Sequence, residues 1–273
     1  MSLTHSAEAT ASRTANSKWL ETLARVGFIG YGIVHLLFAW LALQIAFGGS
    51  GQDGDQSGAM RTLADQPMGK FALVAIAIGL LAMAIWQGLE AAVGHRAERG
   101  KERVMERVAS AGRTVVYLYF AWTAWKVFSD ANSNSADKQE ALTGELMTSS
   151  GGRWLVGLAG LGLAAIGIGL VVYGLIKRFE KHLKTGEMNP KTRKLARRLG
   201  IAGYVAKGAA YAIAGLLIII AAINYDPEKA RGLDAALRTL REQPYGQFLL
   251  ALMALGIAAF GAYCFLQSRY RKV

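Results

Sequence analysis

Six long stretches of the chain are apolar and nearly free of charged side chains, and polar segments separate them. The stretches are residues 26–47, 71–89, 109–128, 154–176, 201–223 and 248–268. A helix needs roughly 20 apolar residues to cross the hydrocarbon core of a bilayer. The pattern therefore predicts an all-α membrane protein with six transmembrane helices.

The third stretch gives the weakest signal, because its strictly uncharged part covers only residues 114–125, between Arg113 and Lys126. Long cationic side chains near the ends of a span can extend to the membrane surface, so a full crossing is compatible with these charges. The alternative is a half-buried helix packed inside the bundle. The internal repeat described below favours the full crossing.

Charge in the connecting segments predicts the orientation. Lys and Arg are concentrated before the first stretch, in residues 96–107 and 177–198, and after the last stretch. The other connections hold most of the acids, among them Asp53, Asp137 and Glu228. Cytoplasmic loops carry an excess of Lys and Arg, so both termini are predicted to be cytoplasmic.

Composition supports this interpretation. The chain is 53% hydrophobic with a net charge of +12, which in a soluble protein would indicate nucleic-acid binding. Here the basic residues flank apolar spans and no nucleic-acid partner is predicted. We expect a disordered cytoplasmic tail over 1–22, without a cleaved signal peptide, and a basic C-terminal tail over 269–273.

The chain contains three tandem units of two spans each: residues 23–93, 105–176 and 195–268. The first and third share the pattern RTLxxQPxGxF, at 61–71 and 238–248, and the middle unit keeps only Leu146, Gly152 and Trp154. Two-span units all insert in the same orientation, and parallel repeats are related by an axis along the membrane normal. We therefore expect a pseudo-threefold bundle.

The repeated QPxG segments predict turns on the outer side of the membrane. A proline disfavours helical geometry at the residue before it, and the glycine allows close backbone approach. A connector between spans is the favoured interpretation, and an outer binding surface is the alternative. The residues are Gln66, Pro67, Gly69, Gln243, Pro244 and Gly246.

The chain resembles the bacterial membrane family catalogued as domain of unknown function 1206. The resemblance rests on three sets of residues: Arg25, Gly27, Gly32 and His35; Gly203, Gly208 and Tyr211; and Pro67 and Pro244. It covers the chain after the N-terminal tail and implies a multi-pass protein of the bacterial plasma membrane, without implying an activity. The middle copy departs from the pattern, with Ala109 and Thr114 in place of glycines and Ser150 in place of proline.

Glycines at one equivalent position of the three units predict close helix contacts. They are Gly79, Gly162 and Gly256.

Superposing the units also places polar residues together inside the bundle. His35, Tyr117 and Tyr211 are equivalent, and Tyr31, Arg113 and Lys207 precede them by one helical turn. Polar groups within spans usually face the bundle interior and mark functional sites. One interpretation is an inward-opening cavity. The other is that the cations extend to the interface while the remaining groups form interhelical hydrogen bonds.

Glu90 is a further candidate for the cavity lining, at the cytoplasmic end of the second span. We expect it to pair with Arg113 or Lys207, or to act as a proton-coupling carboxylate.

Two basic segments are predicted to lie at the cytoplasmic surface. Glu102 and Glu106 alternate with arginines along one helix and are expected to form ion pairs within that helix. The segment 177–198 is less neutralised, and anionic lipid headgroups are its possible ligands.

Catalytic patterns are missing from the sequence. His35 is the single histidine within a span, there is no HExxH, and no metal-ligand spacing occurs. We therefore predict no enzyme activity, metal or cofactor. The favoured function is an accessory or partner-binding membrane component, and the alternative is a small-solute transporter or channel. A wet interior that reaches Lys207 would favour transport; a dry bundle packed by Trp40 and Trp122 would favour the accessory role.

Overall fold

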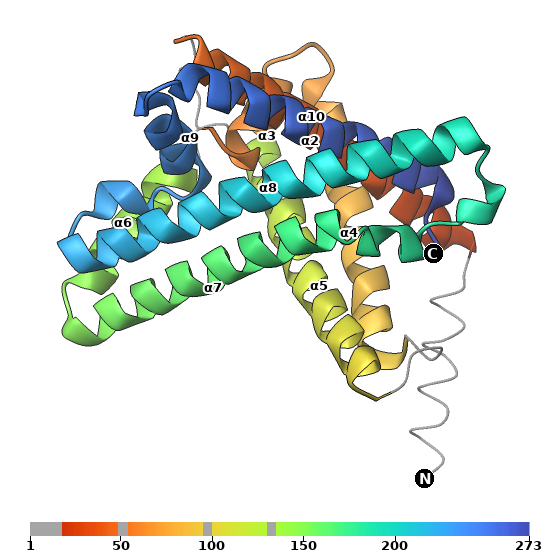
Figure 1. The fold of residues 1–273 in the computed structure, drawn as a ribbon, viewed down its shortest axis with the longest axis horizontal. Helices are drawn as coiled ribbons and strands as arrows, with labels where there is room; N and C mark the ends of the chain where they lie inside the picture. Colours follow the sequence, from red (N-terminus) through yellow and green to blue (C-terminus); the bar gives the residue numbers. More distant parts are fainter. Residues whose placement is uncertain (1–17, 49–53, 95–99, 130–134, 273) are drawn as a thin grey trace.

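The computed structural model describes residues 18–48, 54–94, 100–129 and 135–272. Asp53 and Arg99 lie outside these ranges. The secondary structure of the described residues is helical, apart from one isolated bridge between Leu183 and Arg271. Long helices alternate with short ones (Figure 1). The long helices are α2 (Lys18–Ala46), α4 (Gly69–Val93), α5 (Gly100–Ser129), α7 (Ser150–Leu175), α8 (Pro190–Asn224) and α10 (Gly246–Tyr270).

The short helices lie between these. They are α3 (Gln56–Ala64), α6 (Ser135–Met147), α9 (Leu233–Glu242) and the 3₁₀ turns η1 (Arg178–His182), η2 (Thr185–Glu187) and η3 (Pro227–Ala230). Each pair of long helices in a repeat is thus joined through a short helix, α3, α6 or α9. We refer to that side of the molecule as the α3 end and to the opposite side as the η1 end.

Five of the long helices are long and apolar enough to cross a membrane: α2, α4, α7, α8 and α10. The chain is therefore a multi-pass membrane protein by the length and composition of its helices. Helix α5 covers the third predicted stretch but is less apolar and is not among these five. A full crossing by α5 stays a prediction.

Two predicted boundaries need correction. Helix α2 begins at Lys18, inside the segment 1–22 that was expected to be a disordered tail; residues 1–17 lie outside the described ranges. At the other end, α10 continues to Tyr270 and Arg271 is buried, with its backbone beside Leu183. Residues 269–272, which were predicted to be a tail, are therefore packed against the rest of the protein.

The long helices pack in the order α5–α4–α2–α10–α8–α7. Helices α2 and α4 form an interface within the first repeat, and α8 and α10 form the corresponding interface within the third. In the described residues α5 and α7, the two helices of the middle repeat, form no comparable interface. Figure 1 shows α7 lying along α8 while α5 runs beside α4.

Small residues at equivalent positions make the contacts between repeats. A Cβ on Gly32 would lie 2.9 Å from the carbonyl oxygen of Gly261, and one on Gly208 would lie 2.5 Å from that of Gly167. Close backbone approach of this kind is typical of membrane helix interfaces. The equivalent contact of the middle repeat is between Thr114 of α5 and Gly88 of α4. It is looser, because threonine stands where the other repeats have glycine: a Cβ on Gly88 would lie 3.7 Å from Cγ2 of Thr114.

Two of the three predicted packing glycines lie at such contacts. A Cβ on Gly79 would lie 2.7 Å from the Cα of Gly27, and one on Gly256 would overlap the side chain of Ala206. Gly162 corrects the prediction: it is exposed, and a Cβ there would have no heavy atom within 4 Å. The physical reason is that α7 packs on α8 through another face, which carries Gly167, and has no partner helix on the Gly162 side.

This difference between the glycines leads to a stability prediction. Gly79→Leu and Gly256→Leu should each lower the melting temperature of the detergent-solubilised protein, at a cost of about 1–3 kcal/mol, because the new side chain forces packed backbones apart. Gly162→Leu is the matched control and should leave it within about 0.5 kcal/mol of wild type. A large loss at Gly162, or none at Gly79 and Gly256, would contradict the packing described above.

The repeated turn has a structural explanation that all three repeats share. A Cβ on Gly69, Gly152 or Gly246 would overlap the carbonyl oxygen of Leu63, Leu146 or Leu240 respectively. In the first and third repeats the glycine N–H also donates to the carbonyl of Gln66 (2.8 Å) or Gln243 (2.7 Å). Pro67 and Pro244 lie exposed within these turns. The glycine is thus required because the next long helix starts directly against the end of the short one.

Both ends of the bundle are covered by chain segments. At the α3 end, the first six residues of α3, Gln56–Arg61, are buried against the long helices. At the η1 end, Phe179 and Leu183 are buried, and the Phe179 ring stacks on Tyr204 with centroids 5.5 Å apart.

Large aromatic side chains lie on the outside of the molecule. Trp40 and Trp122 are 54% and 58% exposed, so neither packs the interior as the accessory interpretation assumed. Phe71, Trp154 and Phe248, equivalent residues near the starts of α4, α7 and α10, are exposed at the α3 end. Aromatic side chains gather at membrane–water interfaces, so this position fits a membrane boundary.

Candidate functional site

A buried lysine lies among residues from three long helices. Lys207 of α8 is 9% exposed, and its Nζ donates hydrogen bonds to the hydroxyl of Tyr31 (2.6 Å) and to Nε2 of His35 (3.2 Å), both on α2. The sequence placed these residues together by superposing repeats. The structure brings Tyr31, His35 and Lys207 into direct contact.

The hydrogen bonds define the state of His35. Its Nδ1 lies 2.8 Å from the carbonyl oxygen of Tyr31, which can only accept, so Nδ1 carries the hydrogen. Nε2 then has a free lone pair and accepts from Lys207. Both acceptors of the lysine, a phenol oxygen and an imidazole nitrogen, are therefore electrically neutral.

Aromatic rings enclose the rest of the ammonium group. Nζ of Lys207 lies 4.3 Å from the ring centroid of Phe260 and 5.7 Å from that of Tyr211. Tyr117 of α5 places its ring 5.6 Å from that of Tyr31, so all three repeats contribute to the cluster. Cation–π contacts stabilise such a group but do not neutralise its charge.

Lys207 has no carboxylate partner among the described residues, where its contacts are the hydrogen bonds and rings above. A buried charge that is not paired is expensive, and within a membrane bundle it marks a functional site by default.

One of the predicted cavity residues, Arg113, lies away from the Lys207 cluster. Arg113 reaches the η1 end, where its guanidinium contacts the Gln87 side chain (3.4 Å) and Glu106 (3.7 Å). The contacts of Arg113 and Lys207 described above do not include Glu90, and the pairing of Glu90 stays a prediction. Arg113 and Lys207 are equivalent in the repeat, but Arg113 pairs at the η1 end whereas Lys207 bonds to α2 in the interior.

Unpartnered donors lie beside the cluster and were not found from the sequence. The Gln56 side chain lies beside the hydroxyl of Tyr211, and its Nε2 makes no hydrogen bond within the described residues. Toward the η1 end, the buried Tyr263 hydroxyl and Nε of Arg271 also lack partners there. The Arg271 guanidinium lies 5.3 Å from the ring centroid of Phe28. The interior thus offers hydrogen-bond donors in excess of acceptors.

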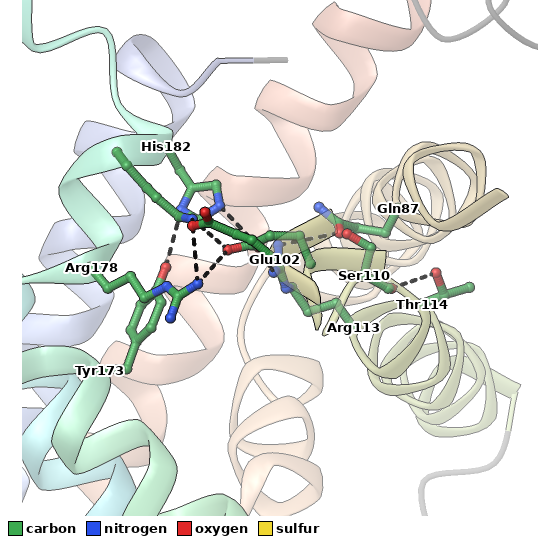
Figure 2. Close-up of polar contacts among 10 residues, drawn as sticks. Gln87, Glu102, Ser110, Arg113, Thr114, Tyr173, Arg178 and His182 are labelled. Carbon is green, nitrogen blue, oxygen red and sulfur yellow. Dashed lines mark hydrogen bonds and ion pairs between the residues drawn. The ribbon is translucent and has the colours of Figure 1, made fainter. Parts of the chain in front are cut away.

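A second polar cluster joins α5 to η1 across the side where α5 and α7 do not pack (Figure 2). Its centre is Glu106, whose side chain is 6% exposed. The carboxylate lies 2.7 Å from Nζ of Lys181 and 3.5 Å from both Arg178 and Nε2 of His182. Glu106 therefore pairs with residues of η1 and with Arg113. The sequence had predicted that it pairs with an arginine of the segment 96–107.

The cluster continues to α7 through His182. Nδ1 of His182 lies 3.1 Å from the hydroxyl of Tyr173, and Glu102 contacts Arg178 (3.5 Å) and Lys181 (3.3 Å) from α5. The labelled residues of Figure 2 come from α4, α5, α7 and η1 and point toward one another. This set is a latch of ion pairs at the η1 end, and we call it the Glu106 latch.

Electrostatics in the latch favour the ionised carboxylate and the neutral imidazole. Burial by itself would raise the pKa of Glu106, but the hydrogen bond from Lys181 and the surrounding cations lower that pKa to about 2. Burial, followed by the charges of Arg271 and Arg113, lowers the pKa of His182 to about 3. At neutral pH the latch therefore holds a carboxylate, a neutral histidine and several cations.

These pKa shifts predict that the latch weakens in acid. An opened η1 binds a proton at His182 below about pH 6.5 and at Glu106 below about pH 4.5, whereas the closed latch resists protonation down to pH values of about 3 and 2. Because the open state binds more protons, stability of the closed state falls as pH falls from about 6.5. Hydrogen exchange of residues 178–184, corrected for intrinsic rates, should be faster at pH 5 than at pH 7. Exchange in α9 serves as the control. Equal protection of η1 at both pH values would contradict the lowered pKa values of His182 and Glu106.

Within the described residues, no group of three His, Cys, Asp or Glu side chains is arranged to hold a metal ion.

Comparisons with known proteins agree with the repeat. The family described as Domain of Unknown Function (DUF1206) matches three stretches of the chain, residues 26–94, 108–177 and 202–271. The uncharacterized protein YxxB of Bacillus subtilis (strain 168) is 31% identical over 259 residues, which cover 93% of this chain and 92% of that protein. No solved structure matches the chain.

Proposed function

Because the chain belongs to the DUF1206 family, whose domain it carries three times in tandem, we propose that it crosses the bacterial plasma membrane six times. The three two-helix repeats insert in parallel around a pseudo-threefold axis, and both termini are cytoplasmic. The equivalent contacts of Gly32 with Gly261 and of Gly208 with Gly167 support the arrangement. The cation-rich segments at the η1 end support the orientation.

Labelling of single cysteines tests the topology. With Cys264 replaced by serine, cysteines at Asp137 and Glu228 should react with an impermeant thiol reagent in intact cells. Cysteines at Arg99 and Lys184 should react only after the cells are opened. Labelling of position 184 in intact cells would reverse the orientation.

The function that the geometry supports best is the binding and passage of an anionic solute through the helix bundle. The observation that carries it is Lys207, a buried cation with neutral hydrogen-bond partners and no carboxylate beside it among the described residues. A fixed cation in a site of low dielectric attracts anions and repels cations. The unpartnered amide of Gln56, beside Tyr211, adds a donor toward the α3 end.

Flux measurements in proteoliposomes test this function. Wild-type protein should carry an anion down its gradient, and Lys207→Met should reduce the rate about tenfold or more, as expected for loss of one charge-assisted interaction. Lys126→Met, which removes an exposed cation of α5, is the control. Wild-type liposomes that pass no anion, inorganic or organic, would refute the proposal.

A second candidate is the non-enzymatic accessory or partner-binding role. The observation in its favour is α7, in which only 22% of the span is buried and which packs on α8 alone among the long helices of the described residues. An exposed membrane helix of this kind is suited to contact another membrane protein. Crosslinking from Gly162 in native membranes should capture one defined protein if this role is correct, and lipid alone if it is not.

A further inference from the structure

We propose that the anion bound at Lys207 is amphipathic, with one negative charge and a hydrocarbon chain, and that it enters from the bilayer between α5 and α7. The inference rests on the proposed function and names its substrate class. Three observations carry it: the two covered ends of the bundle, the unpacked middle repeat, and the apolar surroundings of the cation.

Routes from water to Lys207 are covered at both ends. At the α3 end, Met60 and Ala59 are fully buried, and Asp55 caps α3 by accepting from the N–H of Gly58 (2.8 Å), which holds the segment in place. At the η1 end, Phe179 packs between Tyr204 and Tyr263, with ring centroids 5.5 Å and 5.4 Å away. A hydrated ion approaching along the axis meets packed side chains at either end.

The side of the bundle between α5 and α7 is different. The first and third repeats fill this position with backbone contact, Gly27 against Gly79 and Gly203 against Phe260. The equivalent residues of the middle repeat, Ala109 and Gly162, are both exposed. The sequence explains the difference, because alanine replaces the glycine of α5 that the other repeats use for close approach.

The α5–α7 side is apolar in its middle and polar at one end. Val116 lies two helical turns after Ala109 on α5, and Gly169 two turns after Gly162 on α7; both are exposed, so this face suits a hydrocarbon chain. The Glu106 latch closes the same side at the η1 end, with Lys181 and Arg178 reaching across to α5. This side of the bundle therefore faces the lipid along most of its length, and the latch closes it only at the η1 end.

Contacts lead inward from this side to the cation. Tyr117 of α5 packs against Tyr31, and the hydroxyl of Tyr31 accepts from Lys207. The aromatic rings around Nζ favour an apolar ligand body, and the charge of Lys207 matches a negatively charged head group. A small inorganic anion would have to lose its water without apolar contacts in return, so an acyl carboxylate or an anionic phospholipid fits better.

Photolabelling tests the inference directly. A palmitic acid that carries a diazirine is added to full-length protein in nanodiscs, and labelled peptides are mapped by mass spectrometry. We expect labels on α5 and α7 near Ala109 and Gly162, displaced by unlabelled palmitate or phosphatidylglycerol but not by sodium bromide. Lys207→Met should reduce the labelling about tenfold.

Two glycines of α7 provide matched variants that keep Lys207. Gly162 and Gly151 are both exposed, and a Cβ on either meets no heavy atom within 4 Å, so each tolerates a phenylalanine. Gly162→Phe should lower the labelling severalfold by filling the opening, and Gly151→Phe should not. Equal labelling of these two variants would overturn the lateral entry.

The outcomes separate this inference from the function on which it rests. Displacement of the label by bromide, or Lys207-dependent flux of bromide without specific palmitate labelling, would overturn the amphipathic ligand and leave anion passage standing. Labelling and flux that are both unaffected by Lys207→Met would overturn both proposals.

Discussion

Lys207→Met should reduce anion flux about tenfold or more and at the same time raise the melting temperature. Replacing a buried charged group by an apolar one of similar volume is often stabilising, and here the charge has no carboxylate partner among the described residues to lose. We expect a gain of about 1–2 kcal/mol, or roughly 2–6 °C for a protein of this size, after allowing for the hydrogen bonds lost by Tyr31 and His35.

The measurement is thermal unfolding of the purified variants in detergent, beside the flux assay. Lys126→Met should change neither quantity, because Lys126 is exposed on α5. A variant that melts several degrees below wild type would mean that Lys207 is a structural group whose charge the fold requires, and would contradict its assignment as a ligand site.

Glu106→Gln should have the largest destabilising effect of any single change in the latch. It leaves Lys181, Arg178 and Arg113 close together without their shared buried carboxylate. Removing one partner of a buried ion pair costs about 3 kcal/mol, because the remaining charges are left uncompensated. The melting temperature should fall, and protection of η1 against hydrogen exchange should fall with it.

Glu102→Gln is the control for this variant. Glu102 contacts Arg178 and Lys181 as well, but its side chain is 52% exposed, so its loss should cost less than about 1 kcal/mol. If Glu102→Gln and Glu106→Gln destabilise the protein equally, the latch depends on net charge and not on the buried position of Glu106.

The fold was predictable where the repeat and the apolar pattern act together. Long apolar runs define the helices, and glycines at corresponding positions mark contacts that recur, as Gly69 and Gly246 do at the repeated turn. The central cluster was predictable for the same reason: superposing repeats aligned His35 with Tyr211, one turn beyond Tyr31 and Lys207, and the structure places them in contact.

Departures from the repeat were not predictable by superposition. Gly162 aligns with Gly79, but its partner position holds Ala109, so the contact is not formed and Gly162 faces outward. Arg113 aligns with Lys207, yet it pairs at the η1 end because Glu106 lies two helical turns before it on α5. Symmetry predicts shared positions, whereas the local chemistry of each copy decides its partners.

The Glu106 latch was not predicted, because Glu106 and its partners in η1 lie far apart in the sequence. Helical periodicity places Glu106 on the same face as Ser110 and Tyr117, and that stripe indicates an inward-facing acid. Its partners Lys181 and His182 are in η1, whose fold-back beneath the bundle depends on Phe179 and on the bridge to Arg271. No local sequence pattern predicts that η1 packs back against α5.

The most direct test of the anion site is the position of a heavy-atom anion in crystals of the protein. Crystals grown with 12-bromododecanoate and, separately, with sodium bromide would show bromine by anomalous scattering. The account predicts carboxylate density in contact with Nζ of Lys207 and a bromine signal between α5 and α7 for the first ligand. Ordered side chains with Lys207 bound only to Tyr31 and His35, and no anion density beside it under either condition, would contradict the assignment of Lys207 as the centre of the site.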